Sequence, residues 1–464
     1  MPSNVSVNIK MYRVGELGDC FLLQFKNGAG IAHVLIDCGS FRNGKVSIAR
    51  MRKIATDIKN QLNGSTLDVI VGTHQHNDHL SGFVHAKDIF ESISVGRVWL
   101  SWLDDPTDKK AHKIGKDYNN YLTNLRLIGK QLRSHFGHNK VNSRVQELLG
   151  FFGAPEIYQR RNAKTDKLPP ALPAQARDLL RKIGKQNPKY LNPGEILSLP
   201  GIGNDVKVYV LGPPKKEDLL YDKDPNKDET YDLKLAANGT TASRLLKAMK
   251  QVSGSYKPKE NGEPDFPIDE PYSGSKNFDS VWNNYYHKET WRQIPEDWIN
   301  QAEQLALWLD GFTNNSSLVL AFELVKTNKV LLFAADAQTG NWNSWKEIKW
   351  KKMPKDFSWL SLMNNTVVYK TGHHGSHNST LVEGLNNMTH EELVVLIPVD
   401  KKDPNITKKN GWKMPARNLY EELKKRSQDR IIRMDEGIST SSAWQKLPGT
   451  PKKNNLYCEY DVSG

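Results

Sequence analysis

The stretch from Asp68 to Gly82, with the sequence DVIVGTHQHNDHLSG, decides which fold we expect for this chain. Residues 68–71 are mostly apolar and predict a buried strand of a parallel sheet. The strand ends at Gly72, and three histidines and one aspartate follow within six residues: His74, His76, Asp78 and His79. Imidazole and carboxylate groups together are typical ligands of Zn²⁺, Mn²⁺ or iron. We therefore predict a metal site at the end of this strand.

The spacing of these four side chains favours more than one ion. Four ligands in so short a run cannot converge on a single ion without strain, so we expect His74 and His76 to face one ion. Asp78 and His79 would then face a second ion. The alternative is an ordinary polar loop between a strand and a helix. Histidine is scarce in this chain, however, and three of its 13 copies lie in this run.

Two isolated aspartates stand at the ends of other predicted strands. Asp336 follows the second apolar run of a hairpin predicted over residues 314–324 and 329–337. Asp37 ends an early strand, where it either caps a turn or accepts a hydrogen bond from a ligand imidazole and orients that ring. An aspartate at a strand end is usually a cap, but beside a metal motif it becomes a candidate site residue.

A further strand end carries two adjacent histidines. Residues 366–370 predict a strand, and the loop after it holds His373 and His374. Adjacent residues point in different directions, so we expect one of them to be a metal ligand and the other to support it or to transfer a proton. The sequence leaves open which histidine has which role.

Composition limits the class of protein. With 464 residues the chain has room for two or three ordinary domains or for one elaborated domain. Three scattered cysteines are too few for a disulfide framework or a cysteine-rich zinc site, and they favour a reducing, cytoplasmic location. No apolar run reaches the roughly 20 residues that span a bilayer, so we expect no membrane segment.

The charge of the chain is uneven. Its net charge is +13, and residues 109–200 contain 18 Lys and Arg against six Asp and Glu. Nearly all of the excess therefore lies in this one region, which predicts a polyanionic partner such as nucleic acid. The alternative is a solvated helical surface that happens to be basic.

The run of histidines resembles the signature of the metallo-β-lactamase superfamily, and the chain as a whole is similar to the hydrolase domain of the ComEC competence family and its soluble relatives. Six stretches carry this resemblance: GELGDCFLLQF (15–25), LIDCG (35–39), THQHNDHLSG (73–82), NNSSLVLAFEL (314–324), KVLLFAADA (329–337) and YKTGHHGSHNS (369–379). The resemblance covers residues 4–103, 195–213 and 314–437, and leaves two long segments unexplained.

The resemblance implies an α/β fold, namely a four-layer αβ/βα sandwich with two large, mainly helical insertions. We divide the chain into residues 1–104 for the first half of the core, 105–194 for a basic helical insertion, 195–214 for a return to the core, 215–312 for a second insertion and 313–464 for the second half of the core.

The resemblance also implies two divalent ions, Zn²⁺ or Mn²⁺, with Asp336 bridging them. The implied ligands are His74, His76, Asp78, His79, Asp336 and His373, and the implied supporting residues are Asp37, Lys370 and Ser376. Asp78 or Asp336 would take a proton from the nucleophile, and His374 would protonate the leaving oxygen. Relatives supply one more histidine to the first ion, at a place where this chain has Gly212; the other candidates are His85, His112, His135, His138 and His287.

The function that follows is hydrolysis of a phosphodiester bond in DNA or RNA by a metal-bound hydroxide, with the basic insertion holding the phosphate backbone. One alternative is a hydrolase of a small phosphodiester or a lactone, which needs no basic insertion. Another is a binding subunit with a degraded metal site, within an antiviral defence or DNA-processing complex. In each case the insertions could also bind a protein partner or a second copy of the chain.

Overall fold

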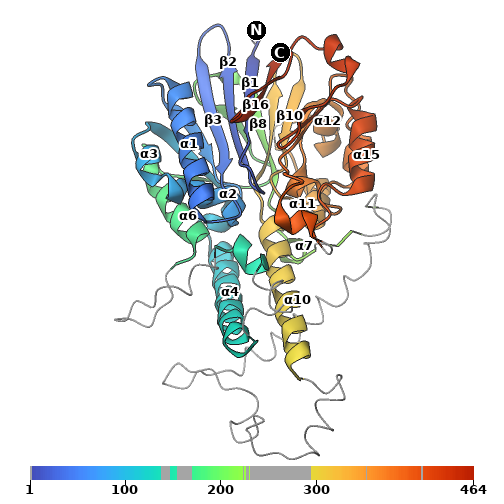
Figure 1. Ribbon diagram of the computed structural model, residues 1–464. Helices are drawn as coiled ribbons and strands as arrows, with labels where there is room; N and C mark the ends of the chain where they lie inside the picture. The colour runs from blue at the N-terminus through green and yellow to red at the C-terminus, as the bar shows by residue number, and fades with distance from the viewer. Residues whose placement is uncertain are drawn as a thin grey trace, which may run out of the picture.

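The structure is a computed structural model that describes residues 3–136, 147–153, 170–222, 224–225, 229, 294–351, 353–408 and 411–464. Within these ranges the chain forms two eight-stranded sheets with helices around them, which is an α/β sandwich (Figure 1). The coarse form of the predicted fold is thereby confirmed. No described helix is long and apolar enough to cross a membrane.

Both sheets combine strands from distant parts of the sequence. The first sheet has the order β15-β16-β1-β2-β3-β4-β5-β6. Its strands are β1 (Ser6–Tyr12), β2 (Cys20–Lys26), β3 (Ile31–Cys38), β4 (Leu67–Val71), β5 (Val95–Ser101), β6 (Lys189–Leu191), β15 (Lys452–Lys453) and β16 (Tyr457–Ser463). The second sheet has the order β14-β13-β12-β11-β10-β9-β8-β7. Its strands are β7 (Ile196–Leu199), β8 (Gly203–Gly212), β9 (Val319–Leu324), β10 (Lys329–Phe333), β11 (Thr366–Lys370), β12 (Val394–Ile397), β13 (Ile431–Arg433) and β14 (Gly437–Ile438).

Each sheet is antiparallel in one part and parallel in another. In the first sheet β1, β2 and β3 pair antiparallel, and β3, β4, β5 and β6 pair parallel. In the second sheet β8, β9 and β10 pair antiparallel, and β10, β11, β12 and β13 pair parallel. Parallel strands end at one edge of a sheet, and that edge is where open α/β sheets place their ligands.

Helices lie on both outer sides of the two sheets (Figure 1). On one side are α1 (Lys45–Leu62), α2 (Asn77–His85), α3 (Lys87–Glu91) and α6 (Leu172–Ile183). On the other side are α11 (Thr339–Ser344), α12 (Trp359–Asn364) and α15 (Arg417–Arg426). The remaining described helices are α4 (Lys109–Phe136), α7 (Glu217–Leu220), α10 (Ile294–Asn315), α13 (Val382–Asn386) and α14 (Pro404–Thr407), with short 3₁₀ helices η1 (Trp102–Asp104), η6 (Trp345–Glu347), η7 (Gly372–Gly375) and η8 (Ser442–Lys446).

Aromatic side chains join the two sheets face to face. The rings of Phe21 on β2 and Phe333 on β10 lie 5.5 Å apart between centroids, and Phe25 and Phe322 lie 5.4 Å apart. All four are buried. Because an aromatic side chain buries about 150–250 Å² of surface, these contacts hold the two sheets in a fixed relation. The strand ends of both sheets are thereby held together as well.

The chain after the histidine-rich run forms two short helices. α2 ends at His85 and α3 begins at Lys87. The backbone of Ala86 leaves the helical region, with φ −119° and ψ 32°. The change of direction lets Phe83 and Phe90 both turn into the core, where their ring centroids lie 4.9 Å apart.

The long helices α4 and α10 pack on each other beside the edge where the parallel strands end (Figure 1). Tyr118 on α4 stacks on Phe312 on α10, with ring centroids 5.2 Å apart, and Tyr118 Oη lies 3.0 Å from Thr313 Oγ1. Tyr121 packs edge-on against Trp308. The two predicted insertions, 105–194 and 215–312, therefore join through these helices.

Three backbone segments cross closely at this edge, and two glycines make room for them. A Cβ on Gly39 would lie 2.4 Å from the backbone of Asp78 and His79, and a Cβ on Gly18 would lie 2.3 Å from Gly39 O. Two hydrogen bonds join the segments, from Asp19 N to Asp78 O at 2.9 Å and from Gly39 N to Asp19 O at 3.1 Å. The end of β3 thus fixes the height of the first turn of α2.

We predict that Gly39→Ala destabilises the protein by about 1–3 kcal/mol, because the added methyl group has to displace backbone atoms in a packed site. Gly28→Ala is the matched control, since a Cβ there would meet nothing within 4 Å. Urea unfolding followed by circular dichroism, with a chelator present, measures both variants. Equal midpoints for the two variants would contradict the close approach described here.

Candidate metal centre

The histidine-rich run lies partly in a loop and partly on a helix, so its side chains form two groups that point in different directions. β4 ends at Val71, and His74 and His76 lie in the loop that follows. α2 starts directly after that loop, so Asp78 and His79 stand on its first turn. All four of these polar side chains are buried.

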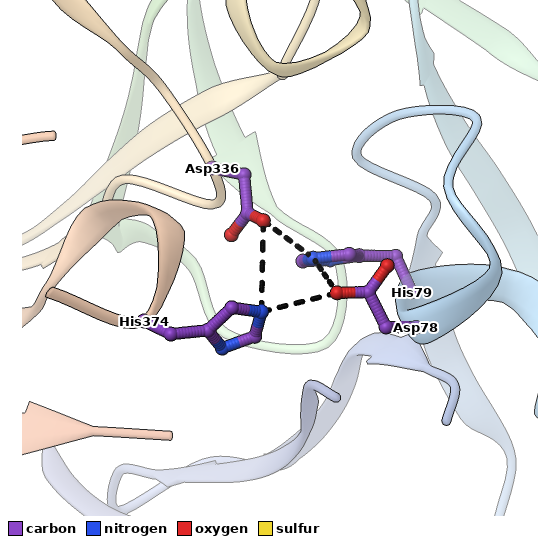
Figure 2. Close-up of side chains that lie close together, drawn as sticks. All are labelled: Asp78, His79, Asp336 and His374. Carbon is purple, nitrogen blue, oxygen red and sulfur yellow. Dashed lines mark hydrogen bonds and ion pairs between the residues drawn. The ribbon is translucent and has the colours of Figure 1, made fainter. Parts of the chain in front are cut away.

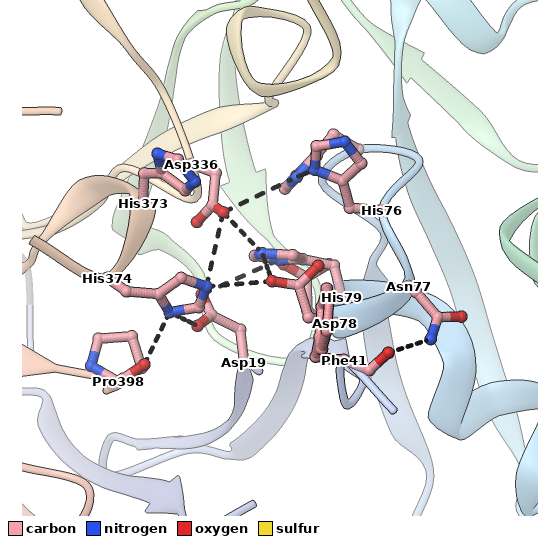
Figure 3. Close-up of polar contacts among 12 residues, drawn as sticks. Asp19, Phe41, His76, Asn77, Asp78, His79, Asp336, His373, His374 and Pro398 are labelled. Atoms are coloured by element: carbon pink, nitrogen blue, oxygen red, sulfur yellow. Dashed lines mark hydrogen bonds and ion pairs between the residues drawn. The ribbon is translucent and has the colours of Figure 1, made fainter. Parts of the chain in front are cut away.

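The second sheet brings an aspartate and two histidines to the same place (Figure 3). Asp336 follows β10, while His373 and His374 follow β11. Both histidines adopt left-handed backbone conformations, with φ of 36° and 52°. Such residues cost of order 1–3 kcal/mol each and concentrate at functional sites. This turn directs the two rings to different neighbours, with their centroids 6.0 Å apart.

Four side chains form a tight cluster between the two sheets (Figure 2). They are Asp78, His79, Asp336 and His374, each offers one ligand atom, and these atoms lie within 4.8 Å of one another. Asp336 Oδ2 is 3.1 Å from His79 Nε2 and 3.8 Å from His374 Nε2. Asp78 Oδ2 is 3.0 Å from His374 Nε2. This group could hold a metal ion.

Hydrogen bonds at Nδ1 of His79 and His374 determine whether the Nε2 atoms, which face the cluster, carry hydrogens. His374 Nδ1 lies 2.7 Å from the carbonyl oxygen of Pro398, which can only accept, so Nδ1 carries the hydrogen. His79 Nδ1 likewise lies 2.8 Å from Asp37 Oδ2. In the neutral rings Nε2 is then an acceptor, and it faces a carboxylate oxygen in both cases. Two acceptors in contact need a cation between them, either a proton or a metal ion.

His74 and His76 form a second group of donor atoms beside this cluster. His74 Nε2 and His76 Nδ1 lie 3.2 Å apart. Two nitrogens bound tetrahedrally to one zinc ion at 2.0–2.1 Å would be about 3.3 Å apart. His74 Nε2 is also 4.0 Å from Asp336 Oδ2, the atom that the first cluster shares. The hydroxyls of Thr73 and Ser317 lie near the opposite nitrogen of His74, at 3.0 and 3.3 Å from Nδ1.

The two oxygens of Asp336 have different surroundings. Oδ1 lies 3.4 Å from Nζ of Lys370, a buried lysine that also contacts Asp19 Oδ2 at 2.5 Å. Oδ2 faces the imidazoles, and among the described residues Oδ2 and His79 Nε2 have no hydrogen-bond partner. Leaving such buried atoms unpaired costs about 1–3 kcal/mol each. Because the two atoms face each other, a cation bound between them would satisfy both.

Burial disfavours the charged form of the side chains in this cluster, and the charges of neighbouring side chains shift their pKa values in the opposite direction. Burial alone would lower the pKa of His79, but the carboxylates of Asp336 and Asp19 outweigh it and raise that pKa well above its usual value. Burial alone would raise the pKa of Asp336, but positive neighbours, His79 foremost, hold it well below its usual range. For His76 burial prevails and lowers the pKa to about 4. The cluster therefore favours a cation among its carboxylates.

Two of the three supporting residues that we expected, Asp37 and Lys370, contact the cluster, and Asp19 is an addition. Asp37 accepts hydrogen bonds from Thr73 N at 2.9 Å and Thr73 Oγ1 at 2.6 Å, besides its contact with His79. Asp19, which binds Lys370, was not among our candidates. It lies within the GELGD turn that contributed to the resemblance, so its position next to a glycine at a strand start was the available signal.

His373 does not lie within the four-residue cluster; His374 does. His373 Nδ1 is 3.1 Å from both Gln338 Nε2 and Ser376 Oγ, and its Nε2 is 3.5 Å from Asn314 Nδ2. Ser376 thus contacts His373 and stands apart from the cluster. The structure distinguishes the two histidines geometrically, which the sequence left open.

Asn341 occupies the space where a histidine in place of Gly212 would have to enter. A Cβ at Gly212 would lie 2.3 Å from Asn341 Oδ1. That side chain is fixed by hydrogen bonds to the carbonyl oxygens of Asn315 and Ser317 and from Trp345 Nε1. Among the other candidates, His85 Nε2 contacts Asn43 Oδ1 and His112 is exposed, while the side chain of His135 and all of His138 and His287 lie outside the described residues.

Comparison with protein-family models and with curated proteins gave no match to this chain.

We predict that His374→Ala weakens metal binding by roughly 100-fold or more, because removing even an outer partner of a ligand costs about 10–100-fold. His373→Ala is the matched control and should retain the affinity within a few fold, since its ring faces Gln338 and Asn314. Titration of the metal-free protein with Zn²⁺ or Mn²⁺ against a chromophoric chelator measures both. The reverse order of effects would show that His373 is the ligand.

Proposed function

We propose that this chain is a divalent-metal-dependent hydrolase of the metallo-β-lactamase type, similar to the ComEC competence-type domain, and that it cleaves phosphodiester bonds of nucleic acid. One observation carries the proposal. Asp336 Oδ2 lies 3.1 Å from His79 Nε2, 3.8 Å from His374 Nε2 and 4.0 Å from His74 Nε2. A single carboxylate oxygen that faces two groups of imidazoles could help to hold two ions.

The residues divide into two positions. The first would be held by His74, His76 and Asp336, and the second by Asp78, His79, His374 and the same Asp336. Nitrogen and carboxylate donors without thiolate suit Zn²⁺ or Mn²⁺. When bound, the ions would activate water and neutralise charge on a phosphate group. The first position has fewer protein ligands, so we expect it to bind its ion more weakly.

The residues around the ions have distinct tasks in this proposal. Asp37 holds the ring of His79, and Lys370 holds Oδ1 of Asp336, so that Oδ2 remains for the ions. Asp78 Oδ1 is buried and has no hydrogen-bond partner among the described residues, which makes it the candidate acceptor for the proton of the nucleophile. His374 has both ring nitrogens engaged, so we do not retain it as the acid for the leaving group.

The surface of α4 supports nucleic acid as the substrate. Its buried side includes Ala111, Ile114 and Tyr118 and faces α10. Its exposed side carries a row of three lysines with spacings of four and three residues, which places them on one face of the helix: Lys109, Lys113 and Lys116. A row of exposed cations on a helix beside the metal centre suits a phosphate backbone.

We predict that the purified protein cleaves plasmid or single-stranded DNA, or RNA, when Mn²⁺ or Zn²⁺ is present, and that a chelator abolishes cleavage. His76→Ala and Asp336→Ala should each lose at least about 100-fold in rate, because each removes a metal ligand. Gel assays with matched amounts of folded variants measure this. Cleavage that persists in both variants, or no cleavage and no metal uptake by the native protein, would refute the proposal.

We also predict that nucleic-acid binding depends on salt through the lysines of α4. The affinity should fall with salt at a slope of about −0.9 per phosphate contact in a log–log plot. Replacing Lys109, Lys113 and Lys116 by Ala should reduce that slope by up to about 3.

The control for this experiment is a triple variant on α1, in which the exposed residues Lys45, Lys53 and Lys59 become Ala. It removes the same charge from a helix on one outer side of the sheets (Figure 1). Fluorescence anisotropy at several salt concentrations measures both variants. An equal change of slope would show that general charge, and not α4, attracts the substrate. No salt dependence at all would favour a small substrate.

A further inference from the structure

The second insertion reaches the metal centre through the last turns of α10. Asp310 Oδ1 lies 3.7 Å from His76 Nε2. The side chain of Asp310 is 11% exposed and that of His76 is 1% exposed, so their contact is shielded from solvent. This nitrogen is the one that faces away from His74, since His76 Nδ1 is 3.2 Å from His74 Nε2.

We propose that Asp310 is a positioning residue, whose carboxylate lies 3.7 Å from His76 Nε2, attracts the hydrogen at that nitrogen and so leaves the lone pair of Nδ1 free for the first metal ion. This inference rests on the proposed metal site. A neutral imidazole has one N–H, and the group that accepts it decides which nitrogen binds metal. Two other imidazoles have hydrogen-bonded partners at their outer nitrogens, Asp37 Oδ2 at 2.8 Å for His79 and Pro398 O at 2.7 Å for His374, whereas Asp310 lies farther from His76.

Other contacts hold Asp310 in place. Its second oxygen, Oδ2, accepts a hydrogen bond from Asn314 Nδ2 at 3.2 Å, which leaves Oδ1 directed to His76. One helical turn lies between the two residues, so α10 itself sets their spacing. The helix is fixed in turn on α4, where Thr313 Oγ1 lies 3.0 Å from Tyr118 Oη.

The surroundings of His76 strengthen this contact. Phe151 and Phe152, from residues 147–153 of the first insertion, lie 5.2 and 5.3 Å from the His76 ring between centroids. An apolar environment strengthens the electrostatic attraction between a carboxylate and an imidazole N–H, because solvent does not compete with it. Both insertions thus bear on one ligand, and the first metal position depends on parts of the chain outside the sandwich.

The test compares metal binding by the full chain and three variants. Asp310→Ala should weaken the first of two Zn²⁺ sites by about 10–100-fold and leave the second unchanged, as expected for loss of an outer partner. Asp310→Asn should lose less, because its amide oxygen still presents partial negative charge to the N–H. Tyr118→Phe is the control, since it loosens α10 without touching His76, and should bind both ions normally. Chelator competition gives the affinities, and Co²⁺ absorption reports the coordination.

Each outcome decides between roles. If the native protein binds two ions and Asp310→Ala binds both with unchanged affinity and Co²⁺ spectrum, the positioning role is wrong while the proposed function stands. If Asp310→Asn loses the first ion as completely as Asp310→Ala, Asp310 is a direct ligand, and the positioning role is also wrong. If the native protein binds no ion, the proposed function fails and this inference fails with it.

Discussion

A carboxylate oxygen surrounded by imidazole nitrogens is the interaction on which the rest of this site depends. Asp336 Oδ2 points at His79 Nε2, and Asp78 Oδ2 points at His374 Nε2. The far nitrogens of both rings donate to oxygen atoms that only accept, so the near nitrogens have lone pairs and not hydrogens in the neutral rings. Such an arrangement is stable only with positive charge inside it. The packing around this edge of the sheets holds these carboxylate oxygens and imidazole nitrogens facing one another.

Two sheets are needed to build it, because no single strand end carries all the groups. The first sheet supplies the run after β4, and the second supplies the turns after β10 and β11. Aromatic contacts such as Phe21 with Phe333 keep the sheets in register with each other. The close backbone contacts of Gly18, Gly39 and Asp78 then fix the position of α2 relative to β3, because they leave no room for even one added methyl group. Packing in the core therefore determines distances between ligands.

The insertions also form part of the site. α10 places Asp310 beside His76, and residues 147–153 place two phenylalanines against the same ring. α4 supports α10 on one face and exposes lysines on the other. In the proposed function, a substrate that binds these lysines would push on the same helix pair that contacts His76. Substrate binding and metal coordination would then be linked through α10.

The sequence alone predicted strands and the polar residues at their ends, because those features follow from local pattern, and the resemblance implied the sandwich. Apolar runs predicted strands, and ligand-type residues at their ends made His74, His76, Asp78, His79 and Asp336 candidates for a metal site. Tertiary structure decided the directions of the side chains and the contacts between residues that are far apart in the sequence. His373 and His374 both have left-handed backbone conformations, which direct their rings to different neighbours, and no spacing rule predicts that turn. Asp19 and Asp310 reach the site only through contacts with residues far away in the chain, at Lys370 and His76. The physical reason is that side-chain direction and long-range packing depend on the whole fold, whereas periodicity depends on neighbours in sequence.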